Sequence, residues 1–294
     1  MKKIIFKGAG TAIITPFTDN GVNFDEFKKL LEFQISEGID AIIVCGTTGE
    51  ASTMSDSEKK ETIKFAVDTI NKRVPVIAGT GGNDTHHSIA LSTYAESVGA
   101  DGLLLVTPYY NKTTQKGLVA HYKAIASSVK IPIILYNVPS RTGLNINPST
   151  ALELSKIENI AAIKEASNNM AQITEIAALC KDNLNIYSGN DDQIVPILSI
   201  GGLGVISVLS NIIPKDTHIM VNSYLKGDFE TAKNLQLSTF GLTKALFNEV
   251  NPIPVKAGLN MLGYNCGIPR LPLIEISDDA SNKLKAEMVS YGLL

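Results

Sequence analysis

The stretch Ile131-Pro132-Ile133-Ile134-Leu135-Tyr136 is a short, nearly continuous apolar run, and a turn containing Pro139 and Gly143 follows it. A run without strict polar–apolar alternation is typical of a parallel strand that is covered on both faces. Similar runs recur roughly every 25 to 30 residues, which predicts a repeated strand–helix unit. The full set of eight is Ile13–Ile14, Ala41–Val44, Val74–Ala78, Leu103–Val106, Ile131–Tyr136, Ile160–Ile163, Leu184–Tyr187 and Val205–Val208.

Amphipathic segments with helix signals separate these runs. Ser55-Asp56-Ser57-Glu58 has the pattern of a capping box, which predicts a helix from there to about Asn71. Asn147 stands before Pro148, and this order places a cap residue ahead of proline at the first helical position. The segments Asp25 to Glu37 and Thr85 to Val98 have the same helical period.

The repeat predicts the fold class. Eight strand–helix units favour a (β/α)8 TIM barrel over an open parallel sheet, because open sheets usually have fewer strands. From about Pro214 onward only helical patterns remain, over Asp216–Leu225, Asp228–Leu246, Pro254–Leu262 and Ser277–Tyr291. We therefore expect a barrel over residues 1–213, with its last helix running to about 226, and a C-terminal helical extension over residues 227–294.

Composition excludes several classes of protein. The 294 residues carry 26 Lys and Arg against 29 Asp and Glu, and this near-neutral balance argues against a nucleic-acid binder. No apolar stretch approaches the roughly 20 residues that span a bilayer, and Lys7 interrupts the only signal-like start. The three cysteines and four histidines have neither disulfide nor metal-ligand spacing. We expect a cytoplasmic protein with no metal, no membrane contact and no nucleic-acid partner.

Glycine-rich stretches do not indicate a nucleotide cofactor. Gly79-Thr80-Gly81-Gly82 lacks the third glycine of a dinucleotide fingerprint, and no Walker A sequence is present. Gly201-Gly202-Leu203-Gly204 precedes the eighth apolar run, which assigns it to the non-catalytic end of a barrel. Asp191-Asp192 is interpreted as a helix cap. The prediction is an enzyme without a cofactor.

The residue that closes the sixth run is the strongest catalytic candidate. In TIM barrels the active site lies at the C-terminal ends of the strands, and Lys164 directly follows Ile160–Ile163. Burial favours the neutral amine of a lysine, and a neutral amine can attack a carbonyl to form a Schiff base. The alternative is an ordinary surface lysine at a strand end.

Three further candidates lie at the same end of the predicted barrel. Tyr136 closes the fifth run, where its hydroxyl can carry protons if it does not simply cap the strand. Arg141 offers a planar fork for a carboxylate, or else forms a structural ion pair. The turn Gly46–Gly49 has small residues that allow close approach of the backbone to an anionic oxygen, although such turns are common.

Taken together, these motifs resemble a known family. The combination of Gly46-Thr47-Thr48-Gly49-Glu50, Tyr136–Gly143 and Ile163-Lys164-Glu165 is similar, in order and in spacing, to the dihydrodipicolinate synthase / N-acetylneuraminate lyase family of class I Schiff-base lyases. The similarity extends from about Thr11 to the C-terminus. It implies a lyase that condenses pyruvate with L-aspartate 4-semialdehyde to 4-hydroxy-tetrahydrodipicolinate, the first committed step of diaminopimelate and lysine biosynthesis.

The resemblance also implies roles for individual residues. Lys164 would form an imine with pyruvate, whose carboxylate Thr47 and Thr48 would hold. Tyr136, Thr48 and Tyr110 would form a proton relay. In the family the counterpart of Tyr110 reaches in from a neighbouring subunit, so we expect a dimer within a homotetramer, a dimer of dimers.

The remaining implied roles concern specificity and regulation. Arg141 would position the carboxylate of L-aspartate 4-semialdehyde, while Gly189 and Ile206 would line the pocket. Regulated members of the family bind lysine at the dimer interface, and they typically carry an acid in place of His87 and an uncharged group in place of Lys59. The two departures predict weak or absent inhibition by lysine, because a cation would face a ligand with two ammonium groups.

Two other functions stay open on the sequence. The first is an N-acetylneuraminate or 2-keto-3-deoxy sugar acid aldolase of the same family, although Arg141 and the pair Glu165-Ala166 argue against it. The second is a barrel that binds a small keto acid without catalysis. Product formation from competing aldehydes separates the first from the predicted synthase, and reductive trapping of pyruvate separates the second.

Overall fold

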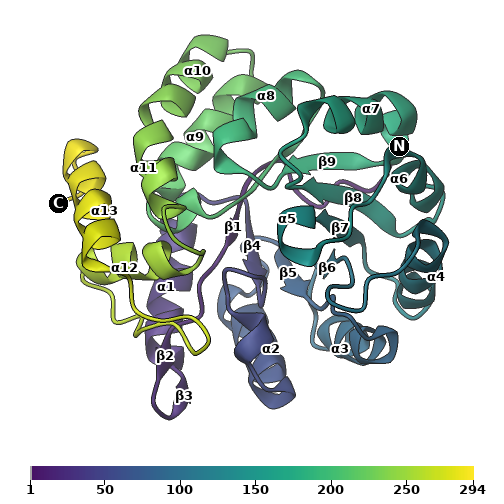
Figure 1. The fold of residues 1–294 in the computed structure, drawn as a ribbon, viewed down its shortest axis with the longest axis horizontal. Helices are drawn as coiled ribbons and strands as arrows, with labels where there is room; N and C mark the ends of the chain where they lie inside the picture. The colour runs from purple at the N-terminus through teal and green to yellow at the C-terminus, as the bar shows by residue number, and fades with distance from the viewer. Residues whose placement is uncertain (1) are drawn as a thin grey trace.

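The protein forms a closed barrel of eight parallel strands, as the repeat predicted (Figure 1). The structure is a computed structural model, and it describes residues 2–294. Each strand pairs with its neighbours in sequence order, and β1 closes the ring by pairing with both β4 and the last strand. The strands are β1 (Gly8–Ala12), β4 (Ala41–Val44), β5 (Val76–Gly79), β6 (Gly102–Val106), β7 (Ile133–Asn137), β8 (Ile160–Glu165), β9 (Asn185–Ser188) and β10 (Gly204–Ser207).

Helices surround the barrel and continue beyond it. The predicted capping box is confirmed, because the Ser55 hydroxyl accepts from the Glu58 amide and the Glu58 carboxylate accepts from the Ser55 amide. The helices are α1 (Phe24–Ser36), α2 (Asp56–Ile70), α3 (Thr85–Ser97), α4 (Gln115–Ala126), α5 (Pro139–Thr142), α6 (Pro148–Leu154), α7 (Met170–Cys180), α8 (Ile194–Ser199), α9 (Pro214–Leu225), α10 (Phe229–Ser238), α11 (Phe240–Leu246), α12 (Ile253–Met261) and α13 (Asp278–Ser290).

Three details differ from the sequence prediction. The first strand is Gly8–Ala12 and not Ile13–Ile14, because the barrel interior has room only for small residues there: a Cβ on Gly10 would lie 2.8 Å from Ile43 Cδ1. A pattern of large apolar residues cannot detect such a strand. The helix expected over residues 228–246 is divided into α10 and α11 at Thr239, and a small hairpin of β2 (Phe17–Thr18) and β3 (Gly21–Val22) was not predicted.

The apolar core has two layers. The larger layer lies between the strands and the surrounding helices, and the smaller one fills the barrel. Successive side chains of a strand point to opposite faces, so each strand contributes to both layers. In β8, Ile163 belongs to the outer layer and Ala162 to the inner layer. At the N-terminal end of the strands, Phe6 stacks on Tyr187 with ring centroids 4.4 Å apart and closes the interior. The interior of the barrel is therefore filled by side chains at this level.

The last helices pack along one side of the barrel. Figure 1 shows α12 and α13 beside α11. The Asn265 amide donates to Glu26 Oε1 of α1 at 3.0 Å, and the rings of Phe33 and Tyr264 lie 5.6 Å apart. The segment between α11 and α13 also reaches the turn after β4, where the Asn251 side-chain amide donates to the Thr48 hydroxyl. None of the helices within residues 2–294 combines the length and apolarity that a bilayer crossing requires.

Candidate active site

Lys164 and Tyr136 lie side by side inside the barrel mouth. β7 and β8 pair in register at these two residues, and Lys164 Nζ lies 4.3 Å from the centroid of the Tyr136 ring. The two side chains share the inner face with Ile134 and Ala162, two positions earlier on each strand, because side chains of a strand alternate between faces. Lys164 is only 5% exposed. The amine is therefore held in the interior against the phenol ring and does not extend into solvent.

A buried polar cluster fixes this register from the outer face of the same strands. Asn137 follows Tyr136, Glu165 follows Lys164, and the Asn137 side-chain amide donates to the Glu165 carboxylate. Asn137 also bonds Asn145 and the Ile146 amide, while the Ser167 hydroxyl donates to Glu165 Oε2 at 2.6 Å. Burial raises the pKa of Glu165. The register between β7 and β8 shifts between Ile133 and Ile134. Beyond this shift, the Asn137–Glu165 hydrogen bond holds the two strands in the register that pairs Tyr136 with Lys164.

The turn after β4 forms the second wall of the site. Thr48 is buried, Thr47 is half-buried, and the Thr15 hydroxyl donates to the Gly49 carbonyl at 2.8 Å. The Thr48 hydroxyl accepts a hydrogen bond from the Asn251 side-chain amide at 3.1 Å. Close packing of this turn on β5 requires glycine there, since a Cβ on Gly79 would lie 2.2 Å from the Cys45 carbonyl oxygen.

Arg141 lies at the rim of the site on the short helix α5. Its guanidinium donates to the Asn251 carbonyl at 3.3 Å, and this is a weak, long contact. Asn251 thus contacts both Thr48 and Arg141, although it is far from either in the sequence. Nothing in the sequence pattern indicated Asn251 as a site residue, because it belongs to the segment before α12 and is placed only by tertiary packing.

Gly189 lies beside Lys164, and Ile206 lies in the barrel interior. A Cβ on Gly189 would lie 3.1 Å from Lys164 Cε, and Ile206 is fully buried in the barrel interior.

The helix-cap interpretation of Asp191 is wrong. Its carboxylate accepts from the amides of Val208 at 3.0 Å and Leu209 at 2.9 Å, and burial raises its pKa. Asp191 therefore ties the ends of β9 and β10 together.

Tyr110 is not near Lys164 within one chain. It follows β6, has a left-handed backbone with φ 66°, and is 92% exposed, so its ring projects from the protomer. The structure brings Lys164, Tyr136, Thr47, Thr48 and Arg141 to one end of the barrel and leaves Tyr110 outside. Within residues 2–294, no hydrogen bond joins the hydroxyl groups of Tyr136 and Thr48.

A cavity of about 330 Å³ leads from the barrel mouth toward α2 and α3. Its lining includes Thr47, Tyr136 and Arg141 from the barrel end and Lys59, Asn83 and His87 from α2, α3 and the segment before α3. Cys45 also faces this cavity, and burial raises the pKa of its thiol to about 12, which excludes a thiolate nucleophile at neutral pH.

No set of three or more His, Cys, Asp and Glu side chains in the described part of the chain has a metal-binding arrangement. The absence of a metal and a cofactor stays a prediction.

Comparison with known proteins agrees with this geometry. Residues 5–290 match the model of the dihydrodipicolinate synthetase family. The chain is 60% identical over 290 residues to 4-hydroxy-tetrahydrodipicolinate synthase 1 of Clostridium acetobutylicum, with 99% of each chain covered.

Solved structures give the same result. Dihydrodipicolinate synthase from Aquifex aeolicus superimposes with a TM-score of 0.96 at 44% identity, covering 98% of this chain and 99% of that one. The chloride-inhibited dihydrodipicolinate synthase from Acinetobacter baumannii, complexed with pyruvate, superimposes with a TM-score of 0.96 at 40% identity and with the same coverage. The chain belongs to the dihydrodipicolinate synthetase family.

Proposed function

We propose that this protein condenses pyruvate with L-aspartate 4-semialdehyde to 4-hydroxy-tetrahydrodipicolinate through a Schiff base on Lys164. The observation that carries the proposal is the buried amine of Lys164 against the ring of Tyr136, at the mouth of a barrel whose relatives are synthases of this product. The enzyme is a class I lyase, and its reaction begins the diaminopimelate and lysine pathway.

The chemistry needs one nucleophile and a means of moving protons. The amine adds to the pyruvate carbonyl and water leaves, which gives an imine that draws electrons from the methyl carbon. That carbon loses a proton, and the resulting enamine attacks the aldehyde of the second substrate. The amino group of that substrate then displaces Lys164 from the imine carbon and closes the ring, so one water is released overall.

The neighbouring residues supply binding and proton transfer in this proposal. The amide and hydroxyl groups of Thr47 and Thr48 hold the pyruvate carboxylate, and the Tyr136 hydroxyl exchanges protons with the substrate oxygen. Arg141 holds the carboxylate of L-aspartate 4-semialdehyde at the rim, while Gly189 and Ile206 leave room at the reacting carbon. A crystal structure of the pyruvate adduct in which the carboxylate contacts neither threonine would contradict the assignment.

The choice of aldehyde tests the function. Purified protein should form product from pyruvate with L-aspartate 4-semialdehyde, and kcat/KM for N-acetylmannosamine in its place should be lower by about 10³ or more, since the site offers a charged fork and not a set of hydroxyl-binding groups. An equal or higher kcat/KM with N-acetylmannosamine or a sugar aldehyde would favour the aldolase. Absence of any reductively trapped pyruvate would favour a non-catalytic binder.

The relay is completed by a second subunit in this proposal. Tyr110 projects from the protomer and its neighbour Tyr109 is 39% exposed, which leaves both rings available to a partner subunit. We infer a dimer in which each Tyr110 enters the other subunit's site, and a homotetramer made of two such dimers. A fully active monomer in sedimentation velocity at assay concentration would contradict this.

Lysine should inhibit this enzyme weakly or not at all. His87 Nε2 lies 2.8 Å from Asp56 Oδ1, and Lys59 Nζ lies 3.7 Å from the same atom. The Asp56 carboxylate beside these cavity-lining residues therefore already contacts two basic side chains. A ligand with two ammonium groups would meet Lys59 without an unpaired carboxylate to accept it. Steady-state rates should be unchanged at 1 mM lysine, and an inhibition constant below about a millimolar would contradict the prediction.

Two organisational predictions are retained as proposals. We place the division between the barrel and the helical extension near residue 213, with the last barrel helix ending at about 226 and the extension over 227–294. We place the enzyme in the cytoplasm, in keeping with three buried cysteines that are all free thiols. Limited proteolysis that cuts only within α9 would argue against the proposed boundary.

A further inference from the structure

The turn after β4 is held from outside the barrel through Glu50. This residue closes the turn Gly46–Glu50, has a left-handed backbone with φ 55°, and is buried. Its carboxylate is fully used: Oε1 lies 2.7 Å from Lys256 Nζ, and Oε2 accepts from the Arg270 backbone amide at 2.8 Å. Both partners belong to the C-terminal part of the chain, more than 200 residues away in sequence.

Lys256 is buried as deeply as its partner. Both side chains of the pair are 1% exposed. Lys256 Nζ also lies 4.4 Å from the centroid of the Phe17 ring and donates to the Ile268 carbonyl at 3.3 Å. Burial lowers the pKa of Lys256, and the adjacent Glu50 carboxylate acts in the opposite direction. Buried ion pairs of this kind are often no more stabilising than apolar pairs of the same shape, so stability alone does not explain the arrangement.

Glu50 is connected directly to the residues that would bind pyruvate. Its backbone amide donates to the Thr47 carbonyl at 3.0 Å, and its carbonyl accepts from the Thr53 amide at 3.0 Å. Only Gly49 separates it from Thr48. A displacement of the Glu50 side chain therefore changes the backbone that carries the Thr47 and Thr48 amides, and hydrogen-bond geometry at those amides depends steeply on angle and distance.

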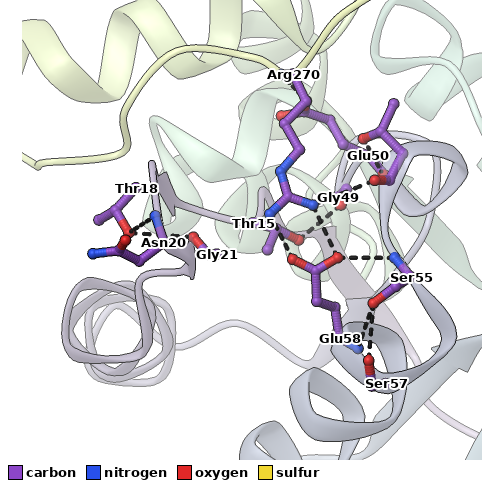
Figure 2. A network of polar contacts seen from close by, with 11 residues as sticks. Thr15, Thr18, Asn20, Gly21, Gly49, Glu50, Ser55, Ser57, Glu58 and Arg270 are labelled. Carbon is purple, nitrogen blue, oxygen red and sulfur yellow. Dashed lines mark hydrogen bonds and ion pairs between the residues drawn. The ribbon is translucent and has the colours of Figure 1, made fainter.

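A second ion pair keeps the C-terminal partner in place. Figure 2 shows the Arg270 guanidinium facing the Glu58 carboxylate, with Glu50 and the Gly49–Thr15 contact beside them. The two Arg270–Glu58 contacts measure 3.0 and 2.5 Å, and the guanidinium carbon lies 4.0 Å from the centroid of the Phe17 ring. The Glu58 pKa is lowered to about 2, chiefly by hydrogen bonding from Arg270. This pair anchors the backbone that donates to Glu50, and the Arg270 guanidinium also donates to the Thr53 carbonyl, three residues after Glu50, at 3.3 Å.

We propose that the Glu50–Lys256 ion pair is a positioning element, through which the C-terminal segment sets the orientation of Thr47 and Thr48 toward the carboxylate of the keto acid. The inference rests on the proposed function and adds two residues to it. Glu50 and Lys256 touch no substrate in this scheme and act only through the turn. Their loss should therefore alter pyruvate binding and adduct formation specifically.

Three variants test the pair: Glu50→Gln, Lys256→Met and the double variant. Glu50→Gln keeps the shape of the side chain, but its amide NH2 group would face either the Lys256 ammonium or the Arg270 amide, and both of these are donors. The KM for pyruvate should therefore rise about tenfold or more, and reductive trapping of pyruvate should slow. The KM for L-aspartate 4-semialdehyde should change much less. The double variant, which carries no unpaired buried charge, should be no worse than the more affected single variant, because the two residues act as one unit. If Lys256→Met does not fold, the double variant still tests the pair.

Asp40→Asn is the matched control. Asp40 Oδ2 accepts from the Ala9 amide at 2.8 Å and lies 2.9 Å from His218 Nδ1, at the opposite end of the barrel. This control should lower the melting temperature and leave the KM for pyruvate unchanged. If Glu50→Gln and the double variant also lose only thermal stability, the inference is overturned and the pair is merely structural. A parent enzyme that traps no pyruvate would overturn the proposed function as well.

Discussion

Replacing Lys164 with alanine should abolish the covalent adduct with pyruvate and lower kcat by at least about 10³-fold. Only the amine can form the imine, so the variant loses the electron sink and not just one binding contact. The fold should persist, because removal of a buried amine leaves the apolar wall of the barrel intact. The measurement is intact-mass spectrometry after borohydride reduction in the presence of pyruvate, together with steady-state rates.

A second lysine at the same end of the barrel provides the control. Lys112 is exposed, and its side chain lies beside Gly143 on the turn after α5. Lys112→Ala should keep both the adduct and the rate, since this side chain lies in solvent and not against Tyr136 in the barrel interior. An adduct that persists in Lys164→Ala, or that peptide mapping assigns to another lysine, would contradict the Schiff-base assignment and leave only the architecture of the site.

Replacing Tyr136 with phenylalanine should lower kcat about 10²- to 10⁴-fold while the protein stays folded. The ring that packs 4.3 Å from Lys164 Nζ is retained, and only the hydroxyl that would exchange protons is removed. Pyruvate should still be trapped, but more slowly, because both formation of the imine and loss of the methyl proton need a proton carrier. Single-turnover trapping and steady-state kinetics separate the two steps.

Tyr187→Phe is the corresponding control, because this phenol hydroxyl bonds Phe6, which precedes β1, and no residue of the proposed relay. Tyr187 pairs in register with Lys164, but its hydroxyl donates to the Phe6 carbonyl, ahead of β1, at 2.6 Å. Its removal should destabilise the protein by about 1 kcal/mol and leave kcat unchanged. If Tyr136→Phe behaves in the same way, with full activity and only a loss of stability, Tyr136 has no part in proton transfer and the relay is wrong.

The strand ends could be predicted because they depend on local patterns. Tyr136 closes one apolar run and Lys164 directly follows another, and in a barrel the end of every run lies at the same edge. The errors have equally physical causes. β1 contains small residues that an apolar pattern does not detect, and Asp191 bonds two amides just after β10 where a cap of the following helix was expected.

By itself, the sequence determined the barrel, the edge on which the site lies, and the lysine, tyrosine and arginine that stand there. Apolar periodicity and helix capping act over short distances, so they are visible along the chain. Only the tertiary structure decided how the turn after β4 is held, because Asn251, Lys256 and Arg270 reach Thr48 and Glu50 across 203 to 220 residues of chain. Contacts between segments so far apart depend on how the whole barrel closes, and they leave no local pattern.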